Sequence, residues 1–195
     1  METNARLLKT TIVDEWANVK TPPAPELKPV TVDPKTSALL ILDIQRQMCT
    51  IEKRPRCVAS VPNILSLLNK ARASGIPVVY SLAGEATATD ILKEVAPNSG
   101  EPVVRSGVDK FFNTDLENIL KEKGIKTVVV TGTSAHGAVL HTATAAALRG
   151  MQVIVPVDGM SSDDIYPEQY TAWHLVNGPG SRQKTILTRS DLIKF

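Results

Sequence analysis

Residues 126–160, KTVVVTGTSAHGAVLHTATAAALRGMQVIVPVDGM, decide the fold. They predict a strand at residues 127–130, a small-residue turn at 132–137, an alanine-rich helix at 138–148 and a second strand at 153–157. A β-α-β unit this short predicts two parallel strands joined by a right-handed crossover. Ligands of open parallel sheets bind beyond the carboxyl ends of the strands, so the turn is the first place to expect chemistry.

The rest of the chain continues this alternation. Strands are predicted at residues 37–42, 76–80, 103–104 and 184–188, and helices at 61–73, 86–95, 114–123 and 162–177. Thr114 and Glu117 form a capping-box pattern at the start of one of these helices. The segment from Gln45 to Arg56 is polar and basic, and is predicted to be a loop. The pattern predicts an α/β fold, with three α/β/α layers around a roughly six-stranded parallel sheet.

Length and composition limit the possible partners. The 195 residues suit one domain, and 43% hydrophobic with 22% charged residues is typical of a globular protein. The net charge of +2 gives no argument for a nucleic acid or an anionic surface. No apolar run approaches the roughly 20 residues that a membrane span needs. We therefore expect no nucleic acid and no membrane, and the ligand site expected at the turn suits a small-molecule substrate.

Residues 1–35 are predicted to be an N-terminal arm, followed by one domain at 36–195. The segment TPPAPELKP at 21–29 holds four prolines and favours an extended path. Apolar side chains earlier in the arm would need cover from this domain or from a neighbouring subunit. A partly disordered tail is the alternative.

The two cysteines, Cys49 and Cys57, are too few for a disulfide framework. The N-terminal sequence METNARLLKTTIVDEW carries charges throughout and lacks the apolar core of a signal peptide. We therefore predict a cytoplasmic protein with reduced thiols.

Asp43 follows the buried strand SALLIL directly. A carboxylate at the carboxyl end of a buried strand is a candidate active-site group. A helix cap or a turn residue explains the same position equally well.

Five short motifs carry a family resemblance: Leu40-Ile-Leu-Asp43-Ile-Gln45, Phe111-x-x-Thr114-x-Leu116, Val129-Val-Thr-Gly132, Thr142-Ala143 and Val157-Asp158. In this order they resemble the isochorismatase-like hydrolase superfamily, which includes isochorismatases, nicotinamidases and N-carbamoylsarcosine amidases. The resemblance covers residues 36–190. It implies a Rossmann-type α/β hydrolase that commonly forms dimers or tetramers, so we expect a homo-oligomer through the arm and helices.

Amidases of this superfamily use an Asp-Lys-Cys triad. The resemblance assigns the aspartate to Asp43 and the cysteine position to Ala138, whose side chain cannot attack a carbonyl. The lysine position falls on Arg105 by spacing and on Lys110 by residue type. An arginine cannot act as a base at neutral pH, which favours Lys110 if the loop 106–110 folds inward.

Two explanations of Ala138 stay open. The chain belongs to a naturally thiol-free branch, as isochorismatases do, whose Tyr-Ala-His-x-Gly turn resembles Ser134-Ala-His-Gly. Alternatively, Ala138 is a Cys→Ala substitution in a Cys-dependent amidohydrolase. The Ala-His similarity favours the natural branch.

The remaining site residues follow from the turn and the motifs. His136 is expected to face a ligand, and the backbone N–H groups of residues 134–138 to hold a carboxylate or oxyanion. The predicted substrate-binding residues are Gln45, Arg105, Phe111, Thr133, Ser134, His136 and Gly137.

We predict no metal and no other cofactor. Nicotinamidases of the superfamily bind zinc through an Asp and a His-x-His after the second strand, and residues 80–85 contain no histidine. His136 and His141 lie about 140° apart around a helix, so they do not share a face. His141 and His174 are expected to be ordinary helix-face residues.

Without a thiol, the simplest mechanism is general acid catalysis by Asp43 on an enol ether. The predicted function is hydrolysis of a small carboxylate-, amide- or enol-ether-bearing substrate. A non-catalytic ligand-binding protein with the same fold is the alternative from another class.

Overall fold

The computed structural model describes residues 11–195. Within them, seven strands form one parallel sheet, in the order β4-β3-β2-β5-β6-β8 with β7 paired to β5. The strands are β2 (Ser37–Leu42), β3 (Val78–Leu82), β4 (Val103–Arg105), β5 (Thr127–Thr133), β6 (Gln152–Pro156), β7 (Met160–Ser161) and β8 (Thr185–Thr188). The predicted parallel α/β sheet is confirmed.

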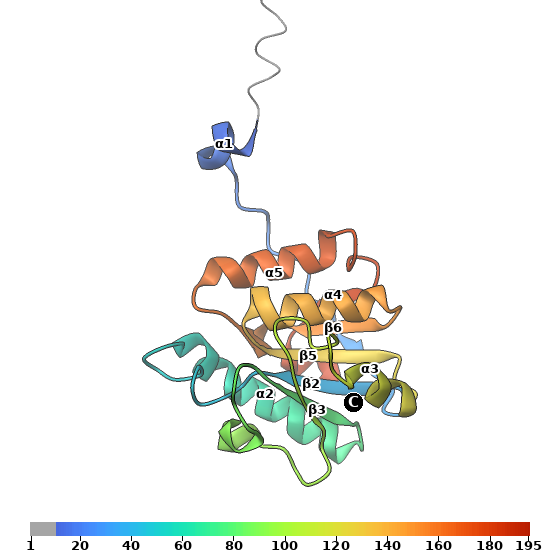
Figure 1. Cartoon of the computed structure of the whole chain (residues 1–195). Helices are drawn as coiled ribbons and strands as arrows, with labels where there is room; N and C mark the ends of the chain where they lie inside the picture. Colours follow the sequence, from blue (N-terminus) through green and yellow to red (C-terminus); the bar gives the residue numbers. More distant parts are fainter. Residues whose placement is uncertain (1–10) are drawn as a thin grey trace, which may run out of the picture.

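Helices cover both faces of this sheet (Figure 1). On one face lies α2 (Pro55–Ala73), and on the other lie α3 (Leu116–Glu122), α4 (Leu140–Leu148) and α5 (Ile165–Asn177). Alternate residues of each central strand point to opposite faces. Leu39 and Ile41 therefore join the core under α2, while Leu40 and Leu42 join the core under α3, α4 and α5.

Several predicted boundaries differ from the structure. Helix α2 begins at Pro55 rather than 61, because proline fits the first helical turn, so the predicted loop 45–56 is shorter. The segment 86–95 forms two 3₁₀ turns instead of a helix. The predicted capping box is wrong, because Asp115 is the N-cap residue of α3 and the Thr114 hydroxyl donates to the Lys110 carbonyl.

The start of the described chain stands away from the sheet (Figure 1). It contains α1 (Ile12–Glu15) and a 3₁₀ turn at Trp16–Asn18. The first backbone hydrogen bond to the body runs from Lys28 N to Leu187 O, and β1 (Val30–Thr31) then pairs with β9 (Ile193–Lys194). Residues 1–10 of the predicted arm lie outside the described residues.

Cys49 and Cys57 are joined by a disulfide, with their Cα atoms 5.3 Å apart. The prediction of reduced thiols is therefore wrong. Because α2 begins at Pro55, Cys57 lies in its first turn, where it meets Cys49 in the turn that follows β2. Both side chains are buried. No helix among residues 11–195 is long and apolar enough to cross a membrane.

Candidate active site

Asp43 lies where the two central strands end. It follows β2 with a φ of 56°, and its neighbour Leu42 pairs with Gly132 of β5. Gly132 has a φ of 127°, and a Cβ at this position would lie 2.1 Å from the Leu42 carbonyl oxygen. Only glycine fits this close approach, which brings the start of the 132–138 turn against the strand that ends at Asp43.

Lys110 forms an ion pair with Asp43. Its Nζ lies 2.7 Å from Asp43 Oδ2 and also donates to the carbonyls of Ser106, at 3.2 Å, and Gly107, at 2.7 Å. The three N–H bonds of the ammonium group thus have three acceptors, which compensates for the complete burial of this side chain. Arg105 is exposed at the end of β4. The structure therefore brings Lys110 to Asp43, and leaves Arg105 outside.

Ser81 completes the surroundings of the carboxylate. Its hydroxyl donates to Asp43 Oδ1 over 2.7 Å from the adjacent strand β3. Burial raises the pKa of Asp43 above the usual 3.8, and the Lys110 charge and the two hydrogen bonds offset only part of this rise. Sequence reasoning missed Ser81, although a serine near the carboxyl end of the buried strand VVYSL is a signal that could have found it.

Ala138 is buried in a π-helical turn, Ala135–Val139, that precedes α4. Two distances show that the loop 106–110 lies against this turn and helix. A Cβ on Gly137 would lie 3.6 Å from Val108 Cγ1, and Lys110 N donates to Thr142 Oγ1, one helical turn after Ala138. Ala138 therefore lies beside the loop that carries the lysine. We expect Asp43 and the 132–138 turn to face one another across one pocket.

Gln45 and Phe111 both have structural contacts. The Gln45 side-chain amide donates to Ala83 O and accepts from Ala83 N, so it clamps the chain after β3. Phe111 is buried in the core under α3 and α4, with the Arg149 guanidinium 4.4 Å from the centre of its ring. Their predicted roles in binding substrate stay predictions.

Thr133 connects the turn to α2 through a residue that sequence reasoning missed. Its hydroxyl donates to Ser161 O and accepts from Arg54 Nη1 at 2.9 Å. Arg54, the N-cap residue of α2, also pairs through Nε with Asp163 at 2.6 Å. The peptide bond between Thr133 and Ser134 is cis. Arg54 thus places its guanidinium beside the 132–138 turn, where it donates to the Thr133 hydroxyl.

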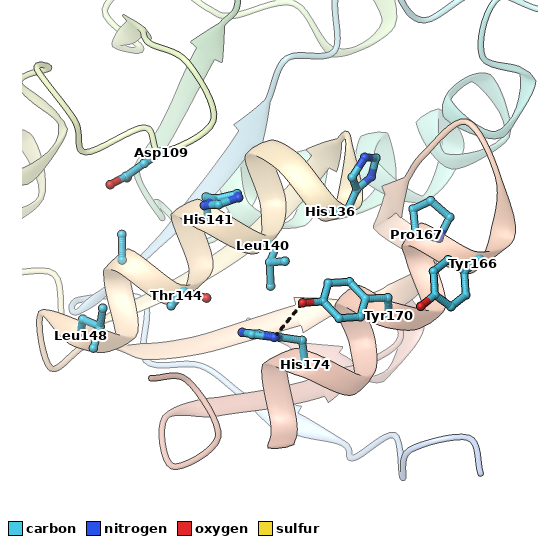
Figure 2. Close-up of a pocket in the computed structure, with 11 residues that line it drawn as sticks. Asp109, His136, Leu140, His141, Thr144, Leu148, Tyr166, Pro167, Tyr170 and His174 are labelled. Atoms are coloured by element: carbon cyan, nitrogen blue, oxygen red, sulfur yellow. Dashed lines mark hydrogen bonds between the residues drawn. The ribbon is translucent and has the colours of Figure 1, made fainter. Parts of the chain in front are cut away.

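His136 lines a surface groove that contains neither Asp43 nor Lys110 among its lining residues. It is exposed, and its Nδ1 lies 2.8 Å from the hydroxyl of the fully buried Ser162. Figure 2 shows it lining a groove between α4 and α5 together with His141, His174 and Asp109. In residues 11–195, no group of three His, Cys, Asp or Glu side chains is placed to hold a metal ion.

Residues 37–182 match the isochorismatase domain. The chain belongs to the isochorismatase family. This confirms the resemblance deduced from the sequence motifs and supports a hydrolase of this family.

Two relatives and one solved structure are similar to this chain. The secreted isochorismatase effector Isc1 of Verticillium dahliae is 36% identical over 149 residues, or 70% of this chain and 78% of the effector. A streptothricin hydrolase of Streptomyces noursei is 31% identical, covering 76% of this chain and 61% of the hydrolase. The crystal structure of an isochorismatase from Pseudomonas putida superposes with a TM-score of 0.74 and 20% identity, covering 84% of this chain and 93% of that one. The last likeness shows the fold alone.

Proposed function

We propose that the protein hydrolyses the enol ether of a small carboxylate substrate, of the isochorismate type, with Asp43 as the general acid. The observation that carries this proposal is the buried group of Asp43, Lys110 and Ser81 beside a turn without a nucleophile at Ala138. A raised pKa keeps a larger fraction of a carboxyl group protonated, which is the state that an acid catalyst needs.

The reaction needs one water molecule and begins with a proton transfer from Asp43. Protonated Asp43 gives its proton to the methylene carbon of the enol ether, and the ether carbon becomes an oxocarbenium ion. Water adds to that carbon and loses a proton, which gives a hemiketal. The hemiketal hydroxyl then loses its proton to form the ketone, while the bond to the ether oxygen breaks and that oxygen takes up a proton. The products are an alcohol and a ketone, here pyruvate, so no covalent intermediate is required.

Lys110 supports this cycle through its Nζ atom. After Asp43 has lost its proton, the Lys110 ammonium 2.7 Å away stabilises the carboxylate that remains. The proton lost by the attacking water then restores the acid. The Arg54 guanidinium beside Thr133 gives the neighbourhood of the turn a positive group that suits a carboxylate on the substrate.

A Cys-dependent amidohydrolase with a Cys→Ala substitution at Ala138 is the second candidate. The Asp43–Lys110 pair favours it as well, because the superfamily's amidases use this pair beside a cysteine. A non-catalytic ligand-binding protein is the third. Pyruvate release from isochorismate and ammonia release from a panel of amides, measured for the native chain and for Ala138→Cys, separate the three.

Two further properties belong to this proposal. We propose a homo-oligomer, supported by apolar side chains that a single copy leaves exposed. A cytoplasmic location stays a prediction that the disulfide does not favour, because such bonds persist mainly in oxidising compartments. The relative from Verticillium dahliae is a secreted effector, which supports an oxidising compartment for this chain.

A further inference from the structure

The described part of the arm has an apolar side that its own body leaves uncovered. Ile12 and Trp16 are four residues apart and lie on one side of the short helical segment, and Val19 follows its end. Their side chains are between 58% and 75% exposed. A tryptophan in this state is unusual, since large aromatic side chains are mostly buried in folded proteins.

The linker keeps this segment at a distance. Residues 21–29 hold four prolines and form neither helix nor strand, and the first backbone hydrogen bond to the body is made by Lys28. The arm is therefore tethered at Lys28 and stands off the body beyond α5 in Figure 1. Such a tether allows the segment to reach another molecule.

Helix α5 carries the matching surface. Tyr166, Tyr170 and Trp173 are spaced by four and three residues, and each is exposed by more than a third of its area. Tyr166 and Tyr170 stack, with ring centroids 6.5 Å apart, so the row is ordered before anything covers it. Figure 2 shows these two tyrosines projecting from α5 toward the adjoining groove.

A cleft of about 580 Å³ separates the two apolar surfaces. It is lined by Ile12, Trp16 and Val19 on the side of the arm and by Tyr166, Tyr170 and Trp173 on the side of α5. The arm thus lies over its own α5 without covering it. Each copy has one apolar segment and one apolar row, both still in contact with solvent.

We propose that residues 12–19 of each copy leave their own body and pack on the Tyr166, Tyr170 and Trp173 row of a second copy, so that two copies exchange these segments across a two-fold axis. The exchange is self-complementary, because each copy supplies one segment and receives one. Each copy contributes six large apolar side chains, three from the arm and three from α5. With roughly 100 Å² removed from each of them, the two copies together bury about 1,200 Å², which is enough for a specific interface. This inference rests on the homo-oligomer proposed above and names the surface that forms it.

The test uses the full chain. Sedimentation should give twice the monomer mass of 21.1 kDa at micromolar concentration. Trp16→Ser and Trp173→Ser should each raise the dissociation constant at least about tenfold, as expected for central aromatic residues of an interface. Leu148→Ser is the matched control, because Leu148 is 70% exposed but lies outside the cleft. Its dissociation constant should stay at the native value.

Cross-linking tests the exchange without depending on the stability of the serine variants. A Trp16→Cys chain is mixed with a mass-tagged Trp173→Cys chain and oxidised, and a disulfide-linked pair containing one chain of each kind is expected. A monomer for the native chain would overturn both the oligomer and the exchange. A dimer that is lost in Leu148→Ser but unchanged in Trp16→Ser would overturn the exchange alone. The exchange would also be overturned if the mixture gave no linked pairs while a single chain carrying both Trp16→Cys and Trp173→Cys formed only a disulfide within itself.

Discussion

Lys110 Nζ lies 2.7 Å from Asp43 Oδ2, and the whole lysine side chain is buried. Replacing either partner leaves the other ionisable group in a water-poor site without its counter-charge. Such a loss costs about 3–5 kcal/mol in folding stability, more than an exposed ion pair contributes.

Lys110→Met should therefore lower the free energy of unfolding by about 3–5 kcal/mol at neutral pH. The loss should shrink at lower pH, where Asp43 becomes protonated and no longer needs a counter-charge. The measurement is urea unfolding followed by circular dichroism. The double variant Asp43→Asn/Lys110→Met should lose less than Lys110→Met alone, and additive losses would contradict the coupling.

Ser81 should set the pH dependence of the reaction. Its hydrogen bond lowers the pKa of Asp43, while burial raises it more. Because the protonated acid is active, the rate should fall as pH rises through a midpoint above 3.8, and Ser81→Ala should move that midpoint to higher pH. Folding stability should also fall as the pH rises through this midpoint, since the folded state binds the Asp43 proton more tightly than the unfolded chain does.

The measurement is kcat against pH for the native chain and the variant. Ser60→Ala is the matched control, because the hydroxyl of this buried serine donates to Cys57 O and not to Asp43. An unchanged midpoint in Ser81→Ala, or an equal shift in both variants, would contradict the assignment.

Gly132→Ala should destabilise the fold by about 3 kcal/mol. A Cβ there meets the Leu42 carbonyl oxygen at 2.1 Å, and alanine is also strained at the φ of 127°. Gly100→Ala is the control, because Gly100 also has a positive φ, of 87°, but nothing within 4 Å of the added carbon. Thermal unfolding of both variants checks this, and equal losses would show that the close approach is unimportant.

The disulfide should contribute about 2–3 kcal/mol, the loop-closure value for a crosslink between residues eight apart. Cys49→Ser/Cys57→Ser should lower the midpoint of urea unfolding, and the variant should no longer respond to reductant. Thiol titration of the native chain in denaturant without reductant should find no free thiol. Two titratable thiols in that experiment would mean that the bond is absent.

The sequence predicted those parts of the molecule that depend on local pattern. The β-branched run 127–130 and the buried run before Asp43 placed the two central strands, because burial on both faces leaves a continuous apolar stretch. The inward position of Lys110 could be stated only as a condition, since it depends on how the loop 106–110 folds.

Residues whose role depends on distant partners were missed. Ser81 meets Asp43 only because β3 lies beside β2, and Arg54 meets Thr133 only because α2 begins next to the 132–138 turn. The disulfide was missed for the same reason. The predicted helix began at residue 61, so Cys57 fell between it and the predicted loop 45–56, and no local pattern brought it to Cys49.

The most direct test of the central claim is the rate of pyruvate release from isochorismate by three forms of the protein. The account predicts turnover by the native chain, a loss of about 10²–10⁴-fold in Asp43→Asn, and no gain in Ala138→Cys. Iodoacetamide should leave the native rate unchanged, because Cys49 and Cys57 are bonded to each other. No pyruvate release by the native chain, with amide hydrolysis appearing only in Ala138→Cys, would contradict the acid mechanism and favour the Cys-dependent amidohydrolase.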